Sequence, residues 1–404
     1  MTKTILLIGT LDTKGKEYAY VRDLIHSRGH ETLVMDVAVI GEPSFQPAIS
    51  SADVATAGGG ELIGLREQGD RGAALTVMGN GAAVLAAQLY AEKKIDGVLA
   101  LGGSGGTSVG TTAMQALPVG FPKVMVSTMA SGDVAPYVGV KDITMMYSVV
   151  DVAGLNRISR QVFGNAVGAI CGMVEQAVSD SADDKPLLAA TMFGVTTRCA
   201  TMVREQLEAA GYEVLVFHAT GSGGRAMEAL IEGGFIAGVA DITTTEWCDE
   251  LVGGVLSAGP TRLDAAAKQG IPQVVSLGAL DMVNFGGRES VPEKFKARNL
   301  YVHNQQVTLM RTSADECRQL GEIIANKLNQ SNGPTTLLMP LKGVSSISVD
   351  GAIFYDPAAD EALFNAIREN INPEKVNLIE MEAAINDPKF AETIATRLLA
   401  MVSK

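Results

Sequence analysis

The chain has 404 residues, of which 47% are hydrophobic, 19% charged and 5% aromatic, and its formal net charge is −13. This length is too great for one comfortable core, so we expect two or three domains. The acidic balance argues against nucleic-acid binding, which needs clustered Lys and Arg, but it leaves nucleotide binding open because backbone N–H groups can hold phosphates.

The cysteines and the lengths of the apolar runs predict the cellular localisation of the protein. The amino terminus reads as a first strand rather than a signal peptide, and no apolar run approaches the ~18 residues that a membrane span needs. We therefore expect a cytoplasmic protein that binds neither membrane nor nucleic acid. Four scattered cysteines without CxxC spacing favour reduced thiols: Cys171, Cys199, Cys248 and Cys317.

Short apolar runs alternate with amphipathic stretches through the first half of the chain. Helices are expected at 17–28 and 81–94. Strands buried on both faces that alternate with helices are typical of a parallel, doubly wound sheet. The predicted strands are residues 4–9, 32–37, 97–103 and 123–128.

The second half repeats this order, with strands expected at 187–194, 212–217, 234–242 and 272–277. Three segments match in sequence: 20–37 with 202–219, 79–101 with 221–242, and 122–127 with 272–276. We therefore predict an α/β fold made of two related Rossmann-like open parallel-sheet domains that arose by internal duplication. The domains are residues 1–180 and 187–404, joined by a polar linker at 179–186.

Three further elements complete the prediction. A long helix at 151–177 has Ala and Gly on one side, which suits close packing against the first sheet or a second subunit, so we expect a homodimer or a dimer of dimers. Strands are expected at 335–340 and 347–349, and a terminal helix at 390–402.

The strongest local motif is the glycine loop that follows the apolar strand at 97–103. A strand, a glycine loop and a helix start direct free N–H groups and the positive helix end at an anion. Neither a Walker A lysine nor GxGxxG at the first strand is present, and a tight turn is the alternative. The predicted cofactor-binding residues here are Gly102, Gly103, Ser104, Gly105, Gly106 and Thr107.

Two other loops are expected at the same sheet edge, because open α/β sheets bind ligands at the carboxyl ends of their strands. The loop at 9–17 offers a carboxylate for Mg²⁺ or ribose and a lysine for phosphate, although Asp12 or Thr13 would also serve as a helix cap. The loop at 126–133 ends another strand with hydroxyls and a carboxylate, and the loop at 78–81 is a weaker candidate. These loops add Asp12, Thr13, Lys14, Ser127 and Ser131 to the predicted cofactor site.

The second domain carries a separate set of charged and glycine residues. Glu246, Asp249 and His303 are candidate catalytic acid–base groups. They suggest an enzyme that acts on a small carboxylated or phosphorylated metabolite in an interdomain cleft. We find no metal-ligand spacing. Candidate substrate-binding residues are Gly223, Gly224, Arg262, Asp281, Asn284 and Arg311.

Five motifs together resemble a bacterial and fungal family related to the amino-terminal region of the tomato mosaic virus resistance protein of plants. They are GTLDTKGKE (9–17), LGGSGGTS (101–108), TTTEWCDELVGG (243–254), GPTRLDAA (259–266) and VSLGALDMVNFGG (275–287). The resemblance covers nearly the whole chain. It implies two Rossmann-like domains, ATP binding in the first and self-association.

In plants the resembling region inhibits viral replication by binding the viral replication protein. Plant members also carry a TIM-barrel extension that resembles phosphoenolpyruvate hydrolases, so a separate partner protein of that kind is conceivable. Three hypotheses follow: an ATP-binding protein that takes up Mg²⁺ with the nucleotide, the small-metabolite enzyme, and a non-catalytic protein-interaction module. Nothing in the sequence decides whether ATP is hydrolysed.

Overall fold

The computed structural model describes residues 2–176 and 185–402. The chain divides into two compact units, Met1–Asp180 and Ser181–Lys404, and we describe each by itself. Most of the predicted linker at 179–186, and the end predicted for the helix at 151–177, lie outside the described residues.

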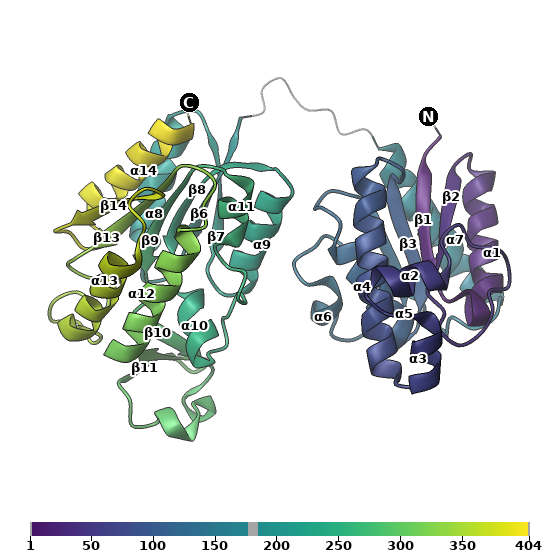
Figure 1. Cartoon of the computed structure of the whole chain (residues 1–404), viewed down its shortest axis with the longest axis horizontal. Coiled ribbons are helices and arrows are strands. Elements are labelled where there is room, and N and C mark those ends of the chain that lie inside the picture. The colour runs from purple at the N-terminus through teal and green to yellow at the C-terminus, as the bar shows by residue number, and fades with distance from the viewer. Residues whose placement is uncertain (1, 177–184, 403–404) are drawn as a thin grey trace. The chain divides into compact units, whose positions relative to one another are not determined.

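The first unit is built on a five-stranded parallel sheet with the order β2-β1-β3-β4-β5 (Figure 1). β3 lies at its centre and every residue of GVLALG in it is buried, as expected of a strand covered on both faces. The strands are β1 (Thr4–Gly9), β2 (Glu31–Asp36), β3 (Gly97–Gly102), β4 (Lys123–Ser127) and β5 (Thr144–Tyr147).

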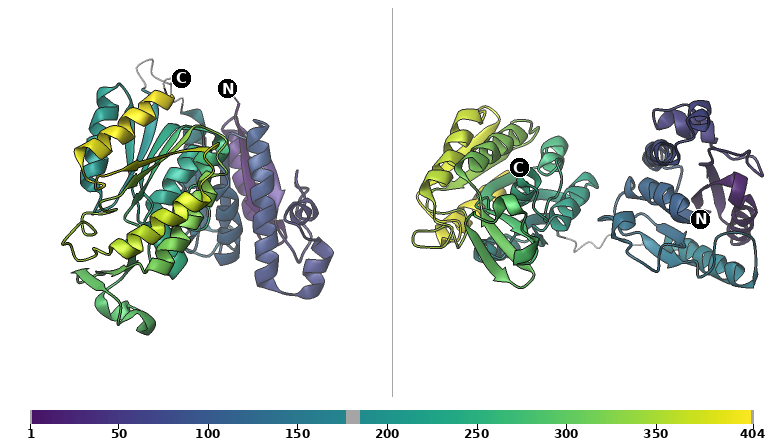
Figure 2. Two further views of the ribbon diagram at one scale, coloured as in Figure 1. Left: turned by 60° about the vertical axis from the view of Figure 1, so that its left-hand side comes forward. Right: turned by 90° about the horizontal axis from the view of Figure 1, so that it is seen from below.

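Helices cover both faces of this sheet (Figure 2). Apolar side chains of α2, α4 and α5 form the core on one face, and those of α1 and α7 form the core on the other. The helices are α1 (Leu11–Ser27), α2 (Ser51–Ala57), α3 (Leu62–Gln68), α4 (Arg71–Ala91), α5 (Ser104–Gln115), α6 (Ala135–Val138) and α7 (Arg157–Glu175).

The second unit contains a six-stranded parallel sheet, again with helices on both faces, in the order β7-β6-β8-β9-β13-β14. Its strands are β6 (Leu187–Met192), β7 (Glu213–His218), β8 (Ile236–Thr243), β9 (Gln273–Gly278), β13 (Thr335–Pro340) and β14 (Val376–Met381). Its helices are α8 (Thr197–Ala209), α9 (Ser222–Glu232), α10 (Glu246–Val252), α11 (Asp264–Gln269), α12 (Ala314–Leu328), α13 (Pro357–Asn370) and α14 (Pro388–Val402).

An antiparallel excursion lies between β9 and α12 in the second unit. It forms a three-stranded sheet in the order β10-β12-β11, which the sequence patterns did not predict. Its elements are β10 (Met282–Phe285), β11 (Leu300–Asn304), β12 (Val307–Arg311) and the short 3₁₀ turns Arg288–Ser290 and Glu293–Phe295.

The two parallel sheets share one topology. Numbered along each parallel sheet, the first five strands of both follow the order 2-1-3-4-5. The three matched sequence segments fall on equivalent elements: α1–β2 with α8–β7, α4–β3 with α9–β8, and β4 with β9. This correspondence supports the predicted duplication.

Several predicted elements need correction. The loops predicted at 9–17 and 102–107 are helical from Leu11 and from Ser104 onward. Residues 78–81 lie inside α4 rather than in a loop: a Cβ on Gly81 would lie 1.9 Å from the carbonyl oxygen of Val54, so this glycine lets α2 approach α4. The helix predicted from 151 begins at Arg157, because the side chain of Asn156 caps it. Residues 347–349 form no strand.

The length of α4 also bears on the membrane question. Within the described residues, α4 is the single helix that is long and apolar enough to cross a bilayer by length and composition. Core helices of soluble proteins pass the same test, and α4 buries Met78, Ala82 and Ala86 in the core of the first unit.

Candidate functional site

The strand order places a topological switch point between β1 and β3. The chain leaves β1 through α1, on one face of the sheet, and leaves β3 through α5, on the other. The loops therefore diverge and leave a crevice at the carboxyl ends of these two strands, the place where open α/β sheets bind ligands.

A cavity of about 690 Å³ occupies this crevice in the first unit. The start of α1 with its N-cap residue Thr10, the residues after β2, the amino terminus of α5 and the start of α4 all contribute to its wall. The predicted site residues that line it are Asp12, Thr13, Lys14, Gly103, Ser104, Gly105 and Gly106.

The amino terminus of α5 presents unpaired donors to this cavity. Gly103 is the N-cap residue, has extended backbone angles and provides no side-chain cap. The first helical hydrogen bond runs from the N–H of Thr107 to the carbonyl of Gly103. Within the described chain, the N–H groups of Ser104, Gly105 and Gly106 donate to no other group. Such a helix start favours an anion by both hydrogen bonding and the helix dipole.

Four predicted cofactor residues lie outside the cavity wall and have other roles. Gly102 is buried at the end of β3, where a Cβ would lie 2.8 Å from the Cα of Gly106. Thr107 and Ser127 are buried and their hydroxyl oxygens are 2.6 Å apart, which joins α5 to β4. Ser131 is exposed in the loop after β4.

Asp12 and Lys14 line the cavity but already have partners within the protein. The Oδ2 atom of Asp12 accepts a hydrogen bond of 3.1 Å from the N–H of Gly41. The ammonium of Lys14 donates to the carbonyl of Val152. The backbone angles of Lys14 itself are not helical, although it lies within α1. α1 is not capped by Asp12: its N-cap residue is Thr10, whose side chain makes no capping hydrogen bond.

The sequence patterns missed the part of the wall that comes from the segment between β2 and α4. This segment and the face of α4 contribute apolar side chains and two arginines. We did not predict them, although residues 58–72 (GGGELIGLREQGDRG) are rich in glycine and charge, and β2 lies next to β1, which borders the switch point. The residues are Val37, Ala38, Val39, Ile40, Leu65, Arg66, Arg71, Leu75 and Met78.

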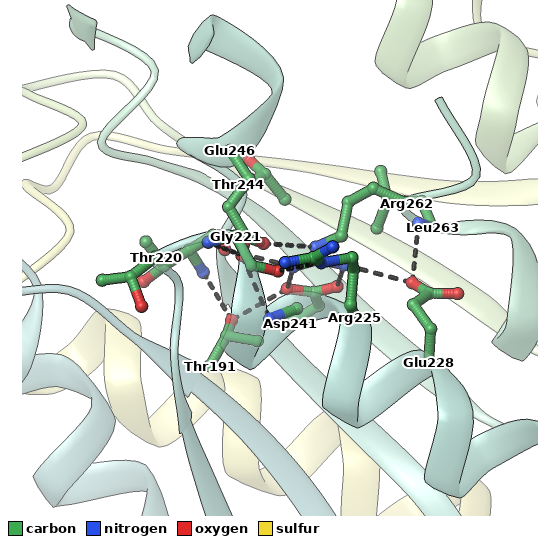
Figure 3. Close-up of polar contacts among 12 residues, drawn as sticks. Thr191, Thr220, Gly221, Arg225, Glu228, Asp241, Thr244, Glu246, Arg262 and Leu263 are labelled. Atoms are coloured by element: carbon green, nitrogen blue, oxygen red, sulfur yellow. Dashed lines mark hydrogen bonds and ion pairs between the residues drawn. The ribbon is translucent and has the colours of Figure 1, made fainter. Parts of the chain in front are cut away.

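The equivalent region of the second unit is filled by its own side chains (Figure 3). Arg262 is buried and pairs bidentately with Asp241 at 2.5 and 2.7 Å. Its Nε donates to Glu246 at 2.7 Å. Burial alone would lower the pKa of Arg262, but these carboxylates outweigh burial and raise it well above its usual value. All five guanidinium donors are used within the protein, which leaves none for a substrate anion.

Glu246 is the first residue of α10, and its carboxylate lies at the amino terminus of α9. Its Oε1 accepts from the N–H groups of Gly221 and Gly224 at 2.7 and 3.0 Å. A Cβ on Gly224 would lie 2.2 Å from this carboxylate, and one on Gly223 would lie 1.9 Å from the carbonyl oxygen of His218. The glycines that we predicted to bind substrate therefore make room for contacts within the protein.

The other residues predicted for the second unit are also engaged, with one exception. Asn284 donates to Asp249, Ser345 donates to Asp281 and Arg311 pairs with Asp360. Burial raises the pKa of both Asp249 and Asp281 to about 6. His303 is exposed on β11, where its ring contacts that of Tyr301.

The described residues contain no group of three or more His, Cys, Asp or Glu side chains that would hold a metal ion by itself. A cation in the first-unit cavity would have Asp12 as a carboxylate ligand, with the hydroxyls of Thr10, Thr13 and Ser104 in the same wall. This set fits Mg²⁺, which proteins commonly bind through one or two carboxylates together with substrate phosphates.

Two doubly wound units, the first with a cavity at its switch point, define a two-domain α/β protein of Rossmann-like architecture. Sequence profiles of the uncharacterised protein family UPF0261 match both units: the N-terminal domain at residues 3–179 and the C-terminal domain at 185–402. The chain therefore belongs to the UPF0261 family.

Relatives extend over the full chain. A UPF0261 protein of Clostridium tetani is 54% identical over 404 residues and is covered completely. The ToMV resistance protein Tm-1(GCR237) of Solanum lycopersicum is 38% identical over 421 residues, which cover 99% of this chain and 56% of the tomato protein. A Streptomyces glycosyltransferase, SsfS6, solved with thymidine diphosphate, has 13% identity and covers 99% and 96% of the two chains, but its TM-score of 0.19 supports no inference.

Proposed function

We propose that the first domain binds a nucleotide, ATP in the first place, with its phosphates at the amino terminus of α5. The observation that carries this proposal is the coincidence of a large cavity, the β1–β3 switch point and three unpaired N–H groups. An anionic group is the natural partner for such donors.

The rest of the wall favours a ligand larger than phosphate. Leu65, Leu75 and Met78 form an apolar side of the cavity, and Ile40 lies in the wall with 87% of its surface exposed. An apolar side chain left in solvent gains from contact with a flat base. The phosphate end and the apolar side together suit a nucleotide better than a small anion.

Mg²⁺ would accompany the nucleotide, with Asp12 as its protein carboxylate; when bound, it would neutralise phosphate charge. The described wall of the cavity supplies two acidic side chains, Asp12 and Asp70. Asp70 is engaged in capping α4. We therefore propose nucleotide binding without assigning hydrolysis.

The alternative enzyme function has less support from the geometry. Glu246 and Arg262, its intended acid and anchor, are buried and paired with each other. A general acid or base must reach a substrate proton, and neither group is free to do so.

Thermal unfolding in the presence of ligands tests the proposal. A ligand that binds only the folded state raises its stability by mass action. Millimolar ATP with Mg²⁺ should raise the unfolding temperature clearly, whereas inorganic phosphate should have little effect. The shifts with AMP and NAD⁺, compared with the shift with ATP, show how much binding depends on the phosphate groups and how much on the adenine base. An equal shift with phosphate alone, or no shift with ATP, would contradict nucleotide binding.

A further inference from the structure

The cavity wall contains three cationic side chains, which differ in their engagement. Lys14 donates to the carbonyl of Val152, and Arg66 donates to the carbonyl of Val39. The side chain of Arg71 makes no hydrogen bond or ion pair with any other described residue. A guanidinium without a partner in a cavity wall is available to a ligand.

Arg71 lies close to the end of the cavity that is proposed to bind the anion. It is the first residue of α4, and its Nη2 atom would lie 3.5 Å from a Cβ on Gly105. The guanidinium therefore approaches the turn of α5 that carries the unpaired N–H groups. The neighbouring Asp70 forms no ion pair with Arg71 in the described structure; its Oδ1 atom accepts from the N–H groups of Gly72 and Ala73.

We propose that Arg71 binds a phosphate group of the ligand together with the first turn of α5, and that it thereby sets the preference for phosphorylated nucleotides over nucleosides. This inference rests on the proposed function. Guanidinium and phosphate form short, charge-assisted and often bidentate hydrogen bonds. α4 thus contributes the cation that a Walker lysine supplies in other nucleotide-binding loops.

Calorimetric titration of the full chain with ATP, AMP and adenosine tests Arg71 separately from the site as a whole. Arg71→Ala should weaken ATP binding by about 10- to 100-fold, the usual worth of a charged hydrogen bond, and leave adenosine affinity unchanged. Arg71→Lys keeps the positive charge but lacks the bidentate guanidinium, so its ATP affinity should lie between those of the wild type and Arg71→Ala. Because Arg71 is exposed at a helix start, the unfolding temperature should not change.

A matched control is Arg160→Ala, which removes an exposed arginine of α7 and should leave every affinity unchanged. If Arg71→Ala binds ATP with wild-type affinity, Arg71 has no such role, although the nucleotide site stands. An equal loss for both ligands would also overturn it, since only a collapsed cavity gives that result. Wild-type protein that binds no nucleotide would overturn the proposed function itself.

Discussion

The hydroxyl of Tyr18 lies between the carboxyl ends of β1 and β3, where it accepts the backbone N–H of Leu101 at 2.8 Å. It also donates toward the carbonyl oxygens of Ile8 and Leu101. The ladder between the strands ends at Ile8 and Ala100, so a side chain of α1 replaces the next strand contact. Burial raises the pKa of Tyr18, which keeps the phenol protonated and able to donate.

Tyr18→Phe should lower the free energy of unfolding by about 1–3 kcal/mol, because it leaves the buried N–H of Leu101 without an acceptor. Urea unfolding measures this loss. Tyr20→Phe, on the same helix and without a hydroxyl hydrogen bond in the described structure, is the control and should be neutral. Equal stability of both variants would show that the Tyr18 contact is dispensable.

Glu246→Gln should destabilise the chain by about 3 kcal/mol, since it removes one carboxylate from a buried guanidinium. Its ATP affinity should be unchanged. The control Glu382→Gln breaks an exposed pair with Lys342 and should leave stability nearly unchanged, because exposed ion pairs contribute little. A Glu246→Gln protein with wild-type stability but a lost enzymatic activity would restore the catalytic role.

Asp281 should make stability fall as pH rises. Its pKa is about 6 in the folded state, where burial raises it from the ordinary value of 3.8. Between these values the folded state holds a proton that the unfolded state has lost, so this group's contribution decreases with rising pH and is constant above the window. From pH 4.5 to 7.5, Asp281→Asn should gain roughly 2 kcal/mol relative to wild type.

Urea unfolding at the two pH values measures this gain, with Asp350→Asn as the control at an exposed carboxylate. If Asp281→Asn and wild type keep the same difference at both pH values, the carboxyl of Asp281 does not titrate in this window.

The glycines of two helices should respond in opposite directions to alanine. Gly81→Ala places a Cβ against the carbonyl of Val54 and should cost about 2–3 kcal/mol. Gly168 in α7 faces open space, so Gly168→Ala should gain about 0.5–1 kcal/mol from helix propensity. Thermal unfolding compares the two. A loss at Gly168 would contradict an open face and indicate that this side of α7 is packed, as the expected homodimer would require.

Much of the fold could be predicted because its strands are short, apolar and separated by clear helical stretches. β5, β14 and the antiparallel excursion were not predicted, and the strands of the excursion have only four or five residues each. The turn predicted at residues 78–81 was wrong because glycines that permit helix contact look like turn glycines in a sequence.

The candidate site was only partly predictable. The α5 loop has a local motif, whereas Arg71 becomes part of the cavity through the packing of α4 on the sheet. In the second unit, the sequence could not show that the charged side chains predicted to bind substrate are buried. Glu246 and Arg262 have the charges of a substrate site, yet they satisfy each other in the interior.

Calorimetric titration of ATP and Mg²⁺ into wild-type protein and Gly105→Val tests the central claim most directly. A Cβ on Gly105 would lie 3.3 Å from Leu75 and 3.5 Å from Arg71, so a valine enters the space assigned to phosphate. We expect one ATP per wild-type chain, and no measurable binding to a Gly105→Val protein that still unfolds at the wild-type temperature. Undiminished ATP binding by Gly105→Val would contradict a nucleotide site at the amino terminus of α5.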